Sequence, residues 1–324
     1  MPQTTPDADA LPEDLPPVEP PSAGFIIQLF VIPALIVAAV IGVWALFGQI
    51  SASDQDWERL VADLRTTNEH RRGRSATALA QMLRADYDLD AKDRKLINNP
   101  VIARELSNLL TEQLKDPTAA DEAGIMHQAF LARTLRLLDA QETVIPALRE
   151  AMKSTHDRDV RKNAVASIAV IAGRMQEENK TLDAPELVDE LVEITTESDP
   201  LLRQLGAFAL GLIPGEISRR RLTVLVEDTF DASTRANAAI GLARQGSTAG
   251  YEAFRDVLTN DSTEIEHLLA LKNVLKAIGE LADRWEASQK TELTGLIEPL
   301  AEGSVETAIK IEAGRALLAL KKAD

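Results

Sequence analysis

Residues 199–215 read DPLLRQLGAFALGLIPG, and the interpretation of the whole chain starts from this stretch. An aspartate followed by a proline is typical of a helix N-cap and first turn, and Pro214 with Gly215 ends the helical pattern. The apolar positions recur at helical spacing and lie on one face. That face carries Gly206 and Ala209, where a core helix normally places large side chains. We interpret these small residues as points of close packing, because helix axes about 8–10 Å apart require short side chains at the crossing.

The same pattern recurs along the chain. An acid or amide is followed four residues later by a cation, then at intervals of three by two small residues. The copies pair Asn68 with Arg72, Asp157 with Arg161, Asp199 with Arg203, Asp231 with Arg235, and Glu306 with Lys310. Successive cations are separated by 89, 42, 32 and 75 residues, so each long interval is expected to contain one degenerate copy. The small pairs Ala129 with Ala132 and Gly279 with Ala282 are the candidates.

The segments DRDVRKNAVASIAV, DPLLRQLGAFALGL and DASTRANAAIGLAR resemble the second helices of HEAT repeats, paired-helix units that stack into an α-solenoid. The resemblance covers roughly residues 54–321 and implies an all-α fold of about seven HEAT-like helix pairs. Amphipathic segments at 143–154, 185–198 and 216–228 are expected to form first helices of these pairs. The resemblance implies little about function, because the family includes scaffolds, transport receptors and a few enzymes.

Two segments precede this array. Residues 1–23 contain seven prolines, five acids and no lysine or arginine, which predicts a disordered acidic tail. Residues 24–48 are predicted to be a single transmembrane helix, because the 23 residues 25–47 carry no charge and can cross a hydrocarbon core of about 30 Å. The solenoid domain is then expected over residues 49–324. A cleaved signal peptide fits less well, since the lead is acidic and the apolar run is long.

The membrane prediction carries two further expectations. No lysine or arginine precedes the predicted span, whereas Arg59, Arg65 and the cluster from Arg71 to Arg74 follow it closely. The solenoid is therefore expected to be cytoplasmic, with the tail outside. The predicted location is the cell (inner) membrane, crossed once. Within the span, small residues fall four apart and would let a partner membrane helix approach closely. These residues are Ala34, Ala38 and Gly42.

The repeated acid and cation invite two interpretations, an anion site or a structural element. We favour the structural one for Asp157 with Arg161 and its copies at 199 and 231, in which the acid caps the helix and the cation pairs with an acid of its own or the adjacent repeat. Arg219, Arg220 and Arg221 point about 100° apart on a helix and cannot form one patch by themselves. The cluster Arg71, Arg72 and Arg74 could meet anionic lipid headgroups.

No chemistry-bearing motif is present in the sequence. The net charge of −16 disfavours a nucleic-acid partner, and the absence of cysteine excludes disulfides, thiolate catalysis and Cys-ligated zinc. The histidines, at positions 70, 127, 156 and 267, form no metal-binding motif, and the repeated His-Glu dipeptides of HEAT-like iron hydroxylases are lacking. We therefore expect no cofactor, no metal and no enzymatic activity.

The predicted function is a membrane-tethered scaffold that binds a protein partner on the surface lined by the second helices. The identity of that partner is not encoded in any motif. An alternative from another class is a repeat-groove enzyme resembling the lyases that attach bilin chromophores to phycobiliproteins. An open groove of mixed charge would favour the scaffold. A closed pocket with clustered carboxylates or histidines would favour the enzyme.

Overall fold

The computed structural model describes residues 24, 34–42, 57–228, 231–303 and 306–323 of the chain. Contacts within the chain divide it into two units, Met1–Trp57 and Glu58–Asp324. The predicted tail at 1–23 lies outside the described residues, as does most of the predicted span at 24–48.

In the first unit, residues 34–42 are helical and their side chains are exposed. Ala34, Ala38 and Gly42 lie one turn apart on this short helix, and a Cβ added at Gly42 would meet nothing within 4 Å. None of the helices within the described residues combines the length and the apolar character needed to cross a membrane.

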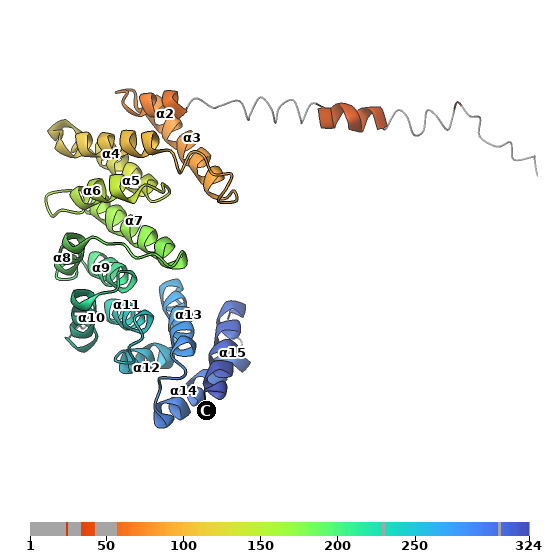
Figure 1. The fold of residues 1–324 in the computed structure, drawn as a ribbon, viewed down its shortest axis with the longest axis vertical. Coiled ribbons are helices and arrows are strands. Elements are labelled where there is room, and N and C mark those ends of the chain that lie inside the picture. Colours follow the sequence, from red (N-terminus) through yellow and green to blue (C-terminus); the bar gives the residue numbers. More distant parts are fainter. Residues whose placement is uncertain (1–23, 25–33, 43–56, 229–230, 304–305, 324) are drawn as a thin grey trace, which may run out of the picture. The chain divides into compact units, whose positions relative to one another are not determined.

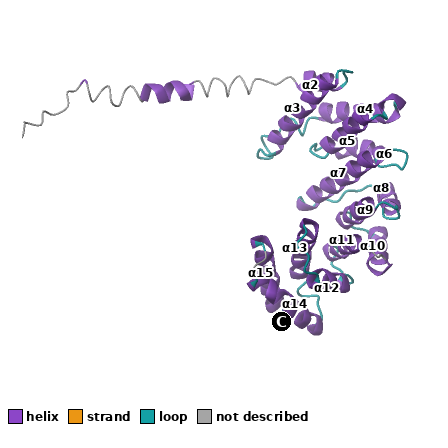
Figure 2. Cartoon of the chain, turned by 180° about the vertical axis from the view of Figure 1, so that it is seen from behind, coloured by secondary structure: helices purple, strands orange, loops and turns teal. Residues whose placement is uncertain are grey.

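The second unit is built from helix pairs (Figures 1 and 2). From residue 57 to residue 322 the described residues form fourteen α-helices and one 3-10 turn, η1 (Pro117–Ala119). The pairs are α2 (Trp57–Leu64) with α3 (Glu69–Tyr87), α4 (Pro100–Lys115) with α5 (Glu122–Leu135), α6 (Gln141–Ala151) with α7 (Arg158–Glu177), α8 (Pro185–Ile194) with α9 (Pro200–Leu212), α10 (Glu216–Asp228) with α11 (Ala232–Arg244), α12 (Tyr251–Thr259) with α13 (Ile265–Glu280), and α14 (Ala287–Glu302) with α15 (Thr307–Lys322). The predicted all-helical fold of about seven pairs is confirmed for these residues.

The pairs stack in chain order. Each second helix from α5 to α13 packs against the second helix of the next pair, so that α5, α7, α9, α11, α13 and α15 form a continuous series. First helices also meet their neighbours, as α4 with α6, α8 with α10, and α12 with α14. From α4 and α5 onward, each pair therefore buries one face against its mate and another against an adjacent pair, which is the packing of an α-solenoid.

Small residues allow the second helices to approach closely. A Cβ added at Gly211 in α9 would lie 2.6 Å from the Cα of Gly241 in α11, a separation that real Cβ atoms essentially never show. Gly206 instead faces its own pair, because its added Cβ would lie 2.9 Å from Cγ2 of Ile194 in α8. Ala209 is fully buried. The small residues of 199–215 are thus divided between the contact within the repeat and the contact with the next one.

Replacing a single hydrogen by a methyl group tests this packing. Gly211→Ala gains helix propensity but forces α9 and α11 apart, so we expect a net loss of about 1–3 kcal/mol in the free energy of unfolding. Gly314→Ala in α15 is the matched control, because its Cβ would meet nothing within 4 Å. That change should be neutral or stabilise the protein by up to about 1 kcal/mol.

Urea unfolding, followed by the circular dichroism signal of the helices, measures the change in the free energy of unfolding for both variants. If the two variants shift the midpoint equally, the close contact between Gly211 and Gly241 does not exist.

Candidate functional site

The three aspartates of the repeated motif are helix N-caps, whereas Glu306 precedes α15 without a capping hydrogen bond from its side chain. Asp157 accepts a hydrogen bond from the backbone N–H of Asp159 at 2.7 Å, and Asp199 accepts one from that of Leu201 at 2.9 Å. Asp231 likewise accepts one from the N–H of Ser233 at 3.1 Å. Each aspartate satisfies a backbone donor that the first helical turn leaves without a partner.

The cations one turn later reach back to the preceding helix. Nε of Arg161 donates to the carbonyl of Met152 at 3.1 Å, and Nε of Arg235 donates to that of Val226 at 2.9 Å. Nη1 of Arg203 donates to the carbonyls of residues 197 and 198, both at 2.9 Å. Arg161 and Arg235 therefore fasten the second helix of a pair to the end of the first, because carbonyls near a helix C-terminus lack intrahelical donors, whereas Arg203 bonds the loop that joins α8 to α9.

The same motif links successive repeats. Arg158 and Arg161 at the start of α7 form ion pairs with Asp199 and Glu197 at the start of the next second helix. Arg203 then pairs with Asp231 at 3.3 Å, and Arg235 with Asp256 of α12. The Arg158 guanidinium lowers the pKa of the Asp199 carboxyl to about 2. Arg161, Arg203 and Arg235 are thus held in ion pairs with acids of neighbouring helices and repeats.

The basic runs do not gather into one surface. Arg220 pairs with Glu216 on its own helix at 3.5 Å, whereas Nε of Arg221 donates to Oγ1 of Thr195 at 2.7 Å. Arg71 pairs with Asp63 at 2.6 Å. Arg72 donates to the carbonyl of residue 66 at 3.1 Å, and Arg74 is exposed.

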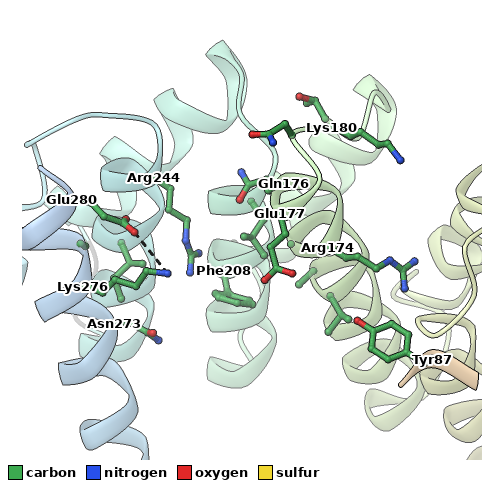
Figure 3. A pocket seen from close by; sticks show the side chains of 18 residues that line it. Tyr87, Arg174, Gln176, Glu177, Lys180, Phe208, Arg244, Asn273, Lys276 and Glu280 are labelled. Atoms are coloured by element: carbon green, nitrogen blue, oxygen red, sulfur yellow. Dashed lines mark ion pairs between the residues drawn. The ribbon is translucent and has the colours of Figure 1, made fainter. Parts of the chain in front are cut away.

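A groove with a volume of about 810 Å³ lies at the C-terminal ends of four successive second helices. Its lining comes from the last turns of α7, α9, α11 and α13, with Tyr87 of α3 at one side (Figure 3). The helices α9 and α11 are 13 residues long, whereas α7 has 20 and α13 has 16. The two shorter helices lie between the longer ones, and the groove occupies the space above their ends.

The groove is lined by side chains of mixed chemistry. Its cations are Arg174, Lys180, Arg244 and Lys276, its acids are Glu177 and Glu280, its amides are Gln176, Asn179 and Asn273, and its larger apolar side chains are Val170, Phe208, Leu212 and Ile240. No histidine is among the lining residues. Within the part of the chain that the structure describes, no three His, Asp or Glu side chains are placed so that they could hold a metal ion.

Several of the charged groups in the groove already have partners. Arg174 donates from Nη1 to the carbonyl of Arg136 at 3.0 Å and from Nη2 to that of Leu138 at 2.8 Å. Lys276 pairs with Glu280 at 3.7 Å, the contact drawn dashed in Figure 3. The Arg244 guanidinium lies over the ring of Phe208, 5.3 Å from its centroid.

Sequence reasoning placed the binding surface on the second helices but named none of these lining side chains. The motif residues from Asp157 to Arg235 lie at the N-terminal ends of the second helices, whereas the groove lies at the C-terminal ends. Arg244 is the last residue of the copy DASTRANAAIGLAR, and Phe208 is the one aromatic residue of the copy that starts at Asp199. In the sequence, the groove is indicated only by this cation and this aromatic residue near the ends of two neighbouring second helices.

Comparison with known proteins gives structural similarities of low identity. No protein-family model and no curated protein matches the sequence. A designed armadillo repeat protein is 18% identical, with a TM-score of 0.41 over 82% of this chain and 100% of its own. A second designed armadillo repeat protein, in complex with the peptide (KR)4, is 16% identical, with a TM-score of 0.41 over 82% and 100%. Human deoxyhypusine hydroxylase is 16% identical, with a TM-score of 0.33 over 83% and 96%.

Proposed function

We propose that this chain is a protein-binding scaffold, and that the groove above α9 and α11 holds a segment of its partner. The observation that carries the proposal is the composition of the groove, in which charged, amide and apolar side chains from four successive repeats face one continuous space. Such a surface suits a chain segment that crosses several repeats, because each repeat contributes a few contacts to an extended ligand.

The lining of the groove gives no support to a catalytic role. A catalytic site brings a nucleophile or a general base together with groups that orient it and stabilise developing charge. The two carboxylates of the lining come from different helices, Glu177 from α7 and Glu280 from α13, and Glu280 is paired with Lys276. No feature of the groove favours the bilin-lyase alternative, and we propose that the chain acts without cofactor and without turnover.

We also propose that the scaffold is tethered to the cell (inner) membrane by residues 24–48, with the repeat unit in the cytoplasm. The support is the sequence, in which residues 25–47 are uncharged and arginines follow the segment but do not precede it. A tether restricts the scaffold to the bilayer and raises the effective concentration of any partner at the same membrane.

A photo-crosslinking amino acid placed in the groove tests the scaffold function. Asn273 is an exposed residue of the groove in α13, and Asn108 is an equally exposed asparagine on the first helix α4. In full-length protein irradiated in cells, the probe at position 273 should form adducts with a defined protein and the probe at position 108 should not. Identical adducts from both positions, or none from position 273, would contradict a partner in the groove.

The orientation can be measured by thiol labelling, because the chain contains no cysteine. Single-cysteine variants at Thr5 in the tail and at the exposed Asp261 report the two sides separately. A membrane-impermeant maleimide should label Thr5→Cys in intact cells whose outer barrier is opened, and Asp261→Cys only after lysis. The reverse order would refute the cytoplasmic assignment, and release of the full chain from membranes by alkaline carbonate would refute the tether.

A further inference from the structure

The groove has the opposite charge balance to the protein around it. The whole chain carries 51 acidic and 35 basic residues, yet the lining of the groove contains four lysines or arginines and two glutamates. Like charges on a ligand and a surface repel one another, whereas a cationic groove in an acidic protein concentrates the field on ligands of negative charge. The surplus of cations in the groove therefore favours the binding of acidic ligands there, whereas the acidic remainder of the protein repels them.

Arg244 is the cation in the groove that is best placed to receive such a ligand. Its side chain is exposed, and it forms neither a hydrogen bond nor an ion pair within the described residues. The ring of Phe208, 5.3 Å from the guanidinium carbon, supports one face of the group. Stacking leaves the N–H donors at the edge of the guanidinium available, and their fork geometry matches the two oxygens of a carboxylate.

The other cations of the groove are less available. Arg174 uses two of its nitrogens on backbone carbonyls, and Lys180 pairs with Glu178 at 2.6 Å. Lys276 is paired with Glu280, the carboxylate that also attracts the Arg244 guanidinium. Neighbouring protein atoms lower the pKa of the Arg244 guanidinium, and the Glu280 carboxylate opposes this shift.

The dimensions of the groove indicate what kind of ligand carries the carboxylate. Four second helices about 10 Å apart span about 30 Å, which an extended segment of about nine residues covers. The side-chain amides of Gln176, Asn179 and Asn273 have no hydrogen-bond partner within the described residues, and they can bond a peptide backbone. Val170 and Phe208 offer apolar surface to its side chains.

We propose that the groove binds an extended acidic segment of a partner protein, and that Arg244, supported by Phe208, binds one of its carboxylates. This inference rests on the proposed scaffold function and adds the chemistry of the partner. Nucleic acid is disfavoured, because the net charge of −16 repels a polyanion as the ligand extends beyond the groove. A small inorganic anion would leave most of the groove and its apolar lining unfilled.

Selection from a displayed library of random 12-residue peptides tests the proposal with full-length protein in detergent. The enriched peptides should contain more Asp and Glu than Lys and Arg. Arg244→Gln should bind these peptides about tenfold more weakly, the usual cost of losing a charge-assisted hydrogen bond, and Arg244→Lys should recover part of the affinity. Arg220→Gln is the matched control, because it removes the same charge from an exposed side chain on α10, outside the groove.

The outcomes separate this inference from the function on which it rests. Enriched peptides that are neutral or basic, or that bind Arg244→Gln as tightly as the wild type, would overturn the acidic assignment while leaving a protein-binding groove. Displacement of the peptides by single-stranded DNA of equal charge would also overturn it. Failure to enrich any peptide, together with no adduct from the probe at position 273, would overturn both.

Discussion

The structure depends on the contact between two glycines, Gly211 of α9 and Gly241 of α11. The backbone of one helix rests on the backbone of the next, since either added Cβ would overlap the opposite Cα. This contact sets the distance between the two central second helices. A larger side chain at either position would increase that distance, and the contacts on both sides of the crossing would have to adjust.

Two other features lie at the opposite ends of the second helices. At the N-terminal ends of the second helices, arginines reach both the preceding helix and the next repeat, and ion pairs of this length form only if neighbouring helices are close. At the C-terminal ends, α9 and α11 are several residues shorter than α7, and the groove lies above the ends of these two shorter helices. The N-terminal side therefore carries ion pairs between repeats, while Arg244 and three side-chain amides on the C-terminal side have no bonding partner among the described residues.

The sequence predicted the parts of this arrangement that are local. A cap aspartate, an arginine one turn later and two small residues lie within one helix, so Asp199 to Ala209 could be interpreted without knowing any neighbour. Of the small pairs predicted to mark the degenerate copies, Ala129 and Ala132 lie in α5. Gly279 lies at the end of α13, where an added Cβ would be 3.3 Å from the Cα of Ala316, and its partner Ala282 lies beyond the helix.

The groove could not be predicted in the same way. The groove exists because the four second helices that line it differ in length. The role proposed for Arg244 depends on the absence of a hydrogen-bonding or ion-pair partner for its guanidinium among the described residues. Arg174 and Arg244 have similar positions near helix ends, yet one is tied to two carbonyls and the other lies free over Phe208. Only the packed structure distinguishes them. The tail and the predicted span, which lie largely outside the described residues, still rest on composition and hydropathy.

The contact between Gly211 and Gly241 can be observed directly by nuclear magnetic resonance on protein labelled only at glycine. With backbones in contact, the Hα protons of the two residues should give a strong nuclear Overhauser cross-peak that disappears in Gly241→Ala. Resolved signals from both glycines with no cross-peak between them would contradict the account, because the helices would then be too far apart for the stack and the groove described above.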